Sequence, residues 1–382
     1  NTPSFYSRDF TMKKTALALF AGAFLANDVS ALIYKAEETG TQIDFTGSAR
    51  LQWRSTANKT SPVNGNTTRN HVNQAVRDNG SRFGFKITQQ LGEGFYALGR
   101  VEWRFQDLAS SQHGFDHLYD RHLYAGFGHK SFGELTYGNM ATIIDEVKQT
   151  DLANTLSLSD GLLPYAARHA IQYTYSGVEG LKVGAFYAGH SQRGANGLDL
   201  SNELKDIWGV GATYKYKIDS KQSIKTGIGF ARDRFEQANR LTYDRNAYAL
   251  GLAYTYDKTT VGVDLERRIT KDQTYVGNKR IEKEVRTVAL QKLTDDLSVY
   301  TMYAYKENKL NAVSGQNDTK RRNNQFMVGS EYYLFSDYLK PMNLKLKAFV
   351  EWQSNHIKNF TNGNKSSRVR DNVTVIGARA YW

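Results

Sequence analysis

The sequence predicts an all-β fold, a 16-stranded antiparallel transmembrane β-barrel with long extracellular loops and short periplasmic turns. Apolar and polar residues alternate with period two in about sixteen segments, and the connections between these segments tend to alternate between short and long. A third observation is one short apolar run near the N-terminus that has the pattern of a secretory signal. If the exported protein spans a membrane without another apolar segment, only a closed barrel satisfies its backbone polar groups.

The composition favours strands and excludes cysteine chemistry. The 382 residues include 24 Tyr, 19 Phe and 32 Gly but only 4 Pro, so strand formers are plentiful and strand breakers are few. There is no Cys, which excludes disulfides, thiolate metal sites and cysteine nucleophiles. The formal net charge of +12 is spread along the whole chain instead of being gathered in one patch or tail, so we expect no nucleic-acid partner.

The N-terminal region predicts export. Met12, Lys13 and Lys14 form a basic start, residues 15–25 are apolar, and small residues follow up to Ala31. The apolar run is shorter than the roughly 20 residues that span a bilayer, so we expect cleavage after Ala31 and no membrane anchor. The expected organisation is a non-native upstream extension at residues 1–11, a signal peptide at 12–31 and a transmembrane β-barrel at 32–382.

The clearest strand covers residues 95–105. Phe95, Val101 and Trp103 lie on one face of this segment, and charged residues such as Arg100 and Glu102 lie on the other. A soluble β-sandwich also alternates, but aromatic residues at both ends of strand after strand are typical of the aromatic girdles of a membrane barrel.

Sixteen segments share this alternation, and most approach the roughly 9 to 11 residues of a tilted membrane strand. An even number returns the chain to the side where it began. The long polar connections 55–79, 269–282 and 354–371 are expected to be mobile, solvated loops. The predicted strands are 41–53, 80–90, 94–105, 118–128, 133–138, 168–176, 181–189, 206–217, 223–234, 246–256, 259–268, 283–293, 297–307, 323–334, 343–354 and 372–382.

The last predicted strand runs to the final residue of the sequence. Ile376, Ala380 and Trp382 share one face of it, and Arg379 and Tyr381 share the other. We expect Trp382, Ala380 and Ile376 to form a C-terminal signal that the outer-membrane insertion machinery recognises by pairing with the strand end.

Other patterns predict no further chemistry. Paired carboxylates stand in turns or near the mature N-terminus, and two histidines four residues apart stand in a polar loop, so we expect neither catalysis nor a metal. Gly209 with Gly211, and Gly227 with Gly229, follow period two inside strands and do not form a phosphate-binding turn. We expect these glycines to allow close packing between subunits or neighbouring strands.

Five stretches together carry a family resemblance: Met12-Lys13-Lys14-Thr15, Ser81-Arg82-Phe83-Gly84-Phe85-Lys86, Gly92-Glu93-Gly94-Phe95-Tyr96-Ala97, Phe132-Gly133-Glu134-Leu135-Thr136-Tyr137-Gly138 and Gly177-Val178-Glu179-Gly180-Leu181. From residue 43 to residue 382 the chain resembles the Gram-negative general diffusion porins, most closely the major outer-membrane porins of the Haemophilus and Pasteurella group. The resemblance implies a homotrimer of sixteen-stranded barrels in the outer membrane, surrounded by lipid and lipopolysaccharide. It implies no cofactor and no enzymatic activity.

The resemblance also implies a third extracellular loop that folds inward and narrows each pore. Residues 139–167 stand where this loop is expected, and we predict that Asp145, Glu146, Asp151 and Asp160 form the acidic side of the constriction. The alternative, an ordinary extracellular loop with solvated carboxylates, stays open for each of these residues.

A basic wall is expected to face the loop. Three arginines match the arginine ladder of the resembling porins in motif context, and four more share the polar faces of the first and third strands. Arginines that reach toward the membrane rim, or that pair with Glu102, are the alternative. The two sets are Arg82, Arg121 and Arg168, and Arg50, Arg54, Arg100 and Arg104.

The predicted function is passive diffusion of small hydrophilic solutes and ions through a water-filled pore with a mild preference for anions. Two rivals remain. A substrate-specific channel would line its pore with a continuous slide of aromatic residues, whereas the polar faces here are charged. An outer-membrane hydrolase would need a convergent catalytic cluster, which the sequence does not display. Adhesion through the long loops is compatible with transport.

Overall fold

The computed structural model describes residues 31–106, 117–158, 161–313, 315–334 and 344–382. The predicted upstream extension and nearly all of the predicted signal peptide therefore lie outside the described residues. No helix in the described ranges is long and apolar enough to cross a membrane. The elements are β1 (Ala31–Ala36), β2 (Thr41–Pro62), β3 (Thr68–Asp78), β4 (Arg82–Gly92), β5 (Phe95–Gln106), β6 (His117–His129), β7 (Gly133–Ala141), the 3-10 helix η1 (Ile143–Glu146), β8 (Ala166–Tyr175), β9 (Leu181–Ala188), β10 (Ser191–Arg193), β11 (Asp199–Lys217), β12 (Gln222–Gln237), β13 (Arg240–Tyr256), β14 (Thr259–Asp272), β15 (Lys279–Lys292), β16 (Leu297–Asn311), β17 (Thr319–Leu334), β18 (Lys345–Thr361) and β19 (Asn364–Tyr381).

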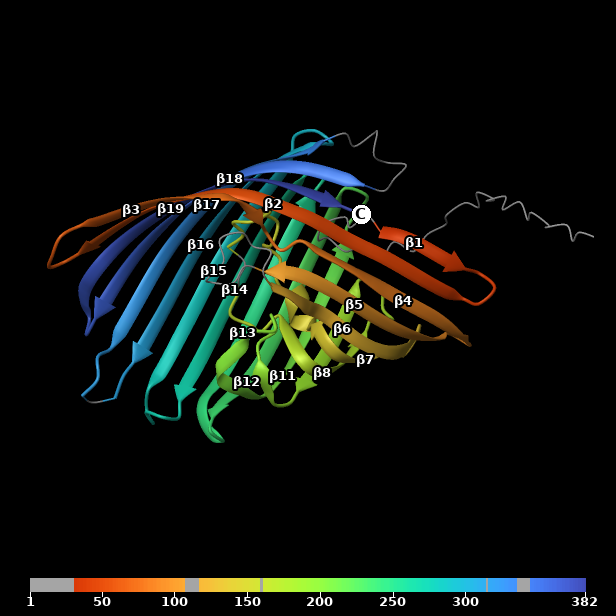
Figure 1. Cartoon of the computed structure of the whole chain (residues 1–382), viewed down its shortest axis with the longest axis horizontal. Helices are drawn as coiled ribbons and strands as arrows, with labels where there is room; N and C mark the ends of the chain where they lie inside the picture. The colour runs from red at the N-terminus through yellow and green to blue at the C-terminus, as the bar shows by residue number, and fades with distance from the viewer. Residues whose placement is uncertain (1–30, 107–116, 159–160, 314, 335–343) are drawn as a thin grey trace, which may run out of the picture.

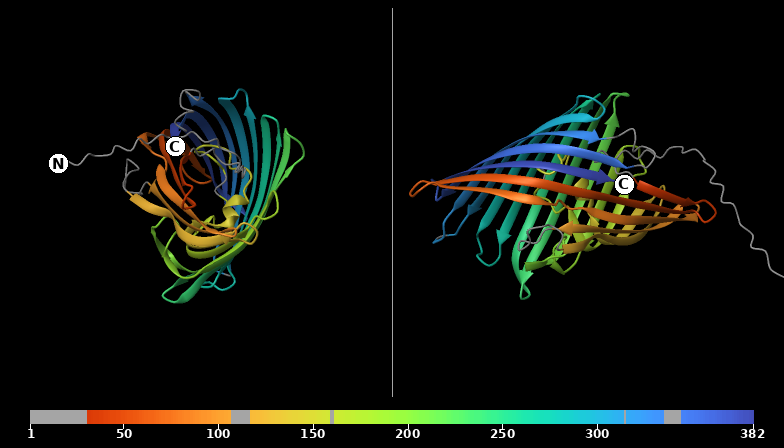
Figure 2. Two further views of the ribbon diagram at one scale, coloured as in Figure 1. Left: turned by 90° about the vertical axis from the view of Figure 1, so that its right-hand side faces the viewer. Right: turned by 45° about the horizontal axis from the view of Figure 1, so that its top comes forward.

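Sixteen of these strands form a closed antiparallel barrel. They are β2, β4 to β9 and β11 to β19, and each pairs with the next around the ring. β9 pairs directly with β11, and β19 pairs with β2 to close the barrel. Figure 1 shows the tilted wall of β11 to β19, and Figure 2 (left) looks into the ring of strands. The predicted fold class is therefore confirmed, and each of the sixteen predicted segments corresponds to one of these strands.

Two additional strands, β3 and β1, pair with β2 next to the ring strands β4 and β19. β3 pairs with the second half of β2, residues 51–60, which is called its outer half below. β4 pairs with the first half, residues 41–48, so β3 and β4 lie along the same side of β2. On the other side of β2, β1 follows the end of β19. Trp382 marks the junction, where its backbone N–H and C=O exchange hydrogen bonds with Gly47 at 3.1 and 2.9 Å.

The alternation in the sequence becomes two different barrel surfaces. In β13, Tyr248, Leu250 and Leu252 are 46–49% exposed, whereas the intervening Ala247 and Ala249 are buried on the inner side. Similar rows of exposed aromatic and aliphatic side chains occur on the other strands. An outward apolar band with polar residues inside is the arrangement that a bilayer requires of a barrel.

The prediction of long, mobile loops at 55–79, 269–282 and 354–371 is wrong. β2 continues to Pro62 and forms a hairpin with β3. β14 extends to Asp272, and β15 begins at Lys279. β18 and β19 are joined by a turn of two residues. The outer ends of these strands are polar on both faces because they extend beyond the apolar band. Period-two alternation, the sequence signal of a membrane strand, is absent there even though the backbone pairing continues.

Candidate site in the barrel lumen

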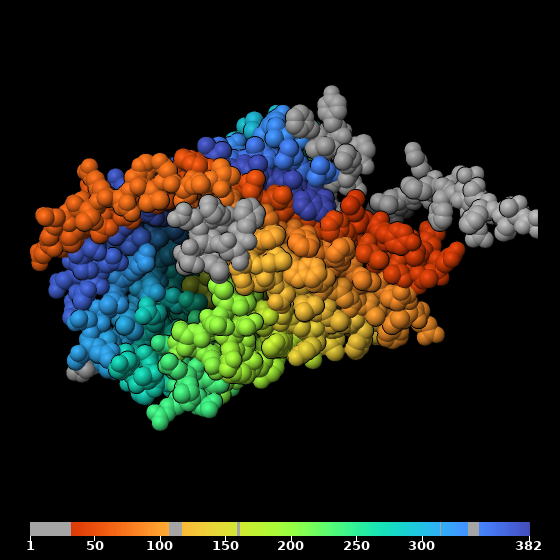
Figure 3. Space-filling view, viewed as in Figure 1, coloured from red at the N-terminus to blue at the C-terminus, as the bar shows by residue number. Residues whose placement is uncertain are grey.

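The described residues between β7 and β8, 142–158 and 161–165, fold into the barrel, as the resemblance implies for the third loop. Figure 2 (left) shows this segment inside the ring, and Figure 3 shows a hollow that opens between the orange, blue and green segments. The segment begins with η1, where Ile143 and Ile144 are buried. In the following text it is called the inner loop.

Apolar contacts hold the inner loop against two regions of the wall. Near its start, Ile143, Ile144 and Val147 are 0–2% exposed and belong to one buried cluster with wall residues of β9 and β11 to β13. Further along, Leu156 and Leu158 pack in a second cluster with residues of β15 to β19. Burying each such side chain contributes roughly 1.5–3 kcal/mol. The loop therefore crosses from one side of the lumen to the other and is fixed at both.

Two buried carboxylates on the wall accept hydrogen bonds from the backbone of the inner loop. Asp264 of β14 accepts the N–H groups of Gln149 and Thr150 at 2.8 and 3.0 Å. Glu351 of β18 accepts the N–H groups of residues 154–156 at 2.7, 2.9 and 2.6 Å. Hydrogen bonds to an ionised acceptor are about twice as strong as neutral ones. Sequence reasoning did not identify either anchor.

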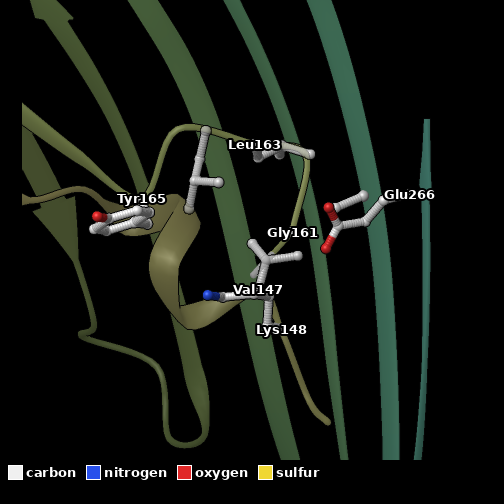
Figure 4. A pocket seen from close by; sticks show the side chains of 8 residues that line it. Val147, Lys148, Gly161, Leu163, Tyr165 and Glu266 are labelled. Atoms are coloured by element: carbon white, nitrogen blue, oxygen red, sulfur yellow. The ribbon is translucent and has the colours of Figure 1, made fainter. Parts of the chain in front are cut away.

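A buried ion cluster stands behind the first anchor. Arg286 of β15 is fully buried and bonds Glu284 at 2.6 Å, Asp264 at 3.4 Å and also Glu266. Glu266 in turn accepts the N–H of Leu162. Figure 4 shows the Glu266 carboxylate facing the stretch of the loop that carries Gly161. Because a buried charge without a partner is costly, the Arg286 guanidinium supplies the partner that these carboxylates need while they bond the loop.

The predicted basic wall gathers around one carboxylate. Glu102 of β5 has a side chain that is 6% exposed, and it bonds Arg121 at 2.8 Å and Arg100 at 2.9 Å. Arg82 stands 4.0 Å from the same carboxylate, as does the ring of His122. Three of the predicted arginines are thus brought together by the pairing with Glu102 that the sequence left as an alternative.

A β-bulge explains why Arg121 joins this wall. Arg121 shares its sequence parity with Leu123 and Phe127, which point outward and are 54% and 59% exposed. The register between β5 and β6 shifts at Glu102 and Trp103, so that Arg121 is the extra residue on β6. A bulge of this kind redirects a side chain relative to strict alternation.

Arg50 and Arg104 lie beside the same group, and the neighbouring strands add cations that the prediction lacked. Arg50 and Arg104 are close enough to Arg82 to repel it electrostatically. Arg379 of β19 stands opposite Arg50 in the strand register, and the Arg50 guanidinium lies 5.8 Å from the Tyr381 ring centre. The alternation of the last strand places residue 379 on the polar face, but only closure of the barrel brings it beside the first strand.

Two of the seven predicted arginines lie elsewhere. Arg168 pairs with Asp120 at 3.2 Å on β6. Arg54 interacts with Asp371 and Arg77 near the outer half of β2. No contact between either arginine and Glu102 occurs among the described residues, so the predicted wall divides into a central group, the Arg168–Asp120 ion pair and Arg54, which Asp371 attracts electrostatically.

The predicted acidic residues take different positions on the inner loop. Asp145 lies near enough to Arg121 to attract its guanidinium, and it also pairs with Lys148 at 3.4 Å. Glu146 is tied to Lys182 on the wall. Asp151 is exposed and accepts a hydrogen bond from Ser157 at 2.7 Å. Asp160 lies outside the described residues.

Lys148 adds a positive charge to the loop. Burial opposes the charge of the Lys148 ammonium, but Asp145, Asp151 and Glu266 outweigh this and raise its pKa above the ordinary value. The loop is therefore not purely acidic.

The structure also locates the remaining predicted features. Ile376 is 54% exposed on the outer face, and Ala380 and Trp382 share its parity at the end of β19. No group of His, Cys, Asp and Glu side chains suited to a metal ion occurs among the described residues. The period-two glycines of β11 and β12 face the inner loop rather than another subunit, because the loop occupies that part of the lumen.

Comparisons with known proteins agree with this architecture. A family model described as Gram-negative porin matches residues 14–339. The "Major outer membrane protein" of Pasteurella multocida strain Pm70 is 27% identical over 97% of this chain and 100% of its own length. Among solved structures, the anion-selective porin of Comamonas acidovorans has a TM-score of 0.61 at 16% identity and covers 90% of this chain and 100% of its own. OmpT of Vibrio cholerae, folded in vitro, has a TM-score of 0.60 at 16% identity, with 92% and 99% covered.

Proposed function

The chain belongs to the Gram-negative porin family, and we propose that its barrel lets small hydrophilic solutes and ions diffuse passively past the inner loop. It is an outer-membrane channel protein of a Gram-negative bacterium. The observation that carries the proposal is the charged lumen of a closed barrel, narrowed by a loop that is anchored at both walls. Such a lumen conducts hydrated solutes by size and charge, and we propose no catalytic role for it.

The constriction lies, in this proposal, between the central arginines and the inner loop. Arg82, Arg100 and Arg121 share the single carboxylate of Glu102, which leaves this group with a net positive charge. Asp145 supplies the opposing negative charge, because it is the loop carboxylate that lies near enough to Arg121 to attract its guanidinium, although it also pairs with Lys148 at 3.4 Å. The separated charges create a transverse field that orders water, so bulky apolar solutes that must displace this water are disfavoured.

A mild preference for anions follows from the excess of cations. Arg50 and Arg104 add to the central group, and Arg379 extends the positive wall on β19. Lys347 of β18 lies beside Arg379 but pairs with Glu331 at 2.9 Å, so it adds no net charge. A ring of like charges biases ion flow in a wide pore without strict selectivity.

Three identical barrels are proposed to form the native assembly. One solved relative in the fold comparison, OmpT of Vibrio cholerae, is described in a trimer form. A gel in which unheated protein migrates at three times the mass of the heated chain supports the trimer, and migration as a single barrel contradicts it.

Phosphorylated lipid, including lipopolysaccharide, is the proposed partner of the outer surface. One row of directly paired residues crosses six strands from β14 to β19, just beyond the outward apolar band. It contains five cations and one carboxylate, which suits phosphate-bearing headgroups. On β11 to β13, outward Arg232 and Arg234 are each paired with an aspartate, whereas the single carboxylate of the row, Glu307, pairs with Arg322 at 3.0 Å. The row is Arg267, Lys283, Glu307, Arg322, Lys358 and Arg368.

Biogenesis completes the proposal. We propose that the leader at residues 12–31 directs export and that the end of β19, with Trp382, Ala380 and Ile376, is the strand that the insertion machinery recognises. N-terminal sequencing of protein from outer membranes tests the first part directly.

Planar bilayer recordings of the purified mature protein in a salt gradient test the channel. We expect large ohmic steps in groups of three and a reversal potential of anion sign. Absence of steps contradicts the channel, block by one sugar at low concentration contradicts low specificity, and a strong cation preference contradicts the proposed charge bias.

A further inference from the structure

Seven glycines on the inner wall face the inner loop. Gly184, Gly211 and Gly229 stand directly side by side across β9, β11 and β12, and Gly227 and Gly251 stand side by side across β12 and β13. Gly209 and Gly262 extend the same strip, which is called the glycine track below. The track runs across five neighbouring strands and lies under the first half of the inner loop.

The loop backbone approaches the track more closely than any side chain would permit. A Cβ atom at Gly227 would lie 2.5 Å from the carbonyl oxygen of Val147 and 2.8 Å from its Cα. A Cβ at Gly251 would lie 2.4 Å from the same oxygen, and one at Gly262 would lie 2.8 Å from the carbonyl oxygen of Gln149. Ordinary contacts between carbon and other heavy atoms begin near about 3.5 Å, so each methyl group would displace the loop.

Backbone conformation does not explain these glycines. Gly227, Gly251 and Gly262 lie within strands and are absent from the residues of positive φ. Glycine costs conformational entropy in a strand and contributes no packing of its own. The close approach of the loop is therefore the physical reason for glycine at these positions.

We propose that the glycine track positions the inner loop and thereby sets the width of the constriction. This inference rests on the proposed channel function but concerns a different property. Charged residues determine which ions the lumen favours, whereas the track determines how far the loop projects toward the arginine wall. An added methyl group at Gly227 moves Val147 away from β12 by about 1 Å, into the lumen.

The experiment compares Gly227→Ala with Gly99→Ala in trimers of the full barrel. At Gly227 the three nearest atoms to the added methyl all belong to the Val147 backbone. At Gly99 of β5 the nearest is a carbonyl oxygen at 4.0 Å, so this variant is the matched control for replacing a strand glycine. We expect a loss of single-channel conductance in Gly227→Ala, native conductance in Gly99→Ala, and the native reversal potential in both.

A compensation test separates loop position from general damage. A Cβ at Gly229 would meet the Val147 Cγ2 side-chain atom at 3.1 Å, not the backbone. We expect this contact to lower the conductance of Gly229→Ala. Val147→Ala removes the Cγ2 atom, so it should restore conductance in Gly229→Ala. It should not restore conductance in Gly227→Ala, where the backbone carbonyl is the obstacle.

The outcomes distinguish the two proposals. If the native protein forms channels and Gly227→Ala and Gly99→Ala have equal conductance, the role of the track is overturned. The channel function then remains intact. If Gly227→Ala does not assemble, the Gly229→Ala pair decides: rescue by Val147→Ala supports the track, and failure of that rescue refutes it. Absence of any channel in native protein refutes the proposed function instead.

Discussion

Replacing Glu102 with glutamine removes the single carboxylate on which the central arginines converge. Arg121 and Arg100 bond it at 2.8 and 2.9 Å, and Arg82 stands at 4.0 Å. Glutamine retains the shape and one hydrogen-bond acceptor but leaves the guanidinium groups without their negative partner. The wall beside the constriction becomes more positive by one charge.

The size of the effect follows from Coulomb's law. An ion that passes at about 5 Å from the carboxylate interacts with it by about 0.8 kcal/mol in water, or about 0.5 kcal/mol with screening at 0.1 M salt. With screening at 0.1 M salt, the change favours anions and disfavours cations by about 0.5 kcal/mol each, so the anion-to-cation permeability ratio rises about fivefold. Because breaking a buried ion pair costs about 3–5 kcal/mol, the barrel should also unfold at a lower temperature.

The assay is the reversal potential across a tenfold salt gradient, with Glu179→Gln as the control. Glu179 is exposed in the short turn between β8 and β9, so its substitution changes the net charge equally without touching the lumen wall. A reversal potential that is the same in both variants would refute the idea that ions pass close to Glu102. A shift toward cations would refute the assignment of a basic wall.

Three further predictions concern the loop, the lipid face and biogenesis. Glu351→Gln weakens the anchor that accepts three loop N–H groups, so we expect noisier open channels and faster proteolysis of the loop than in the exposed control Glu38→Gln. Ile376→Arg places a charge on the apolar outer face and should cost about 2–4 kcal/mol where the site is deep in the bilayer; the folded fraction in a heat-shift gel should fall more than for Ser366→Arg at the outer end of β19. Trp382→Ala removes the ring that covers Gly47, and it should reduce insertion into outer membranes while folding in detergent persists; equal surface levels would argue against the C-terminal signal.

The sequence predicted the strands well where one face meets lipid and poorly where neither does. Residues 95–105 alternate clearly, and β5 covers Phe95–Gln106. β2, by contrast, runs nine residues beyond the predicted end at residue 53, to Pro62. The added residues are polar on both sides, and backbone hydrogen bonds to β3 and β19 hold them in the extended form without any side-chain signal.

The anchors of the inner loop were beyond sequence reasoning for a different reason. The carboxylate of Asp264 and the N–H of Gln149 are separated by 115 positions, and the corresponding separation for Glu351 and Asn154 is 197. In the sequence, each carboxylate looks like any inward-facing charge of a polar lumen. Only closure of the barrel shows which charges face water and which face the backbone of the loop.

The two sides of the constriction are therefore built by different interactions, and this makes their contributions separable. The loop side depends on close backbone contact at Gly227 and on buried carboxylate anchors, neither of which leaves a net charge facing the solute. The opposite side depends on guanidinium groups that exceed the charge of Glu102. Gly227→Ala should thus change conductance with little change in reversal potential, and Glu102→Gln should change the reversal potential more than the conductance. If Gly227→Ala and Glu102→Gln each changed conductance and reversal potential in equal proportion, this separation would be contradicted. The width and the charge of the pore would then depend on the same contacts.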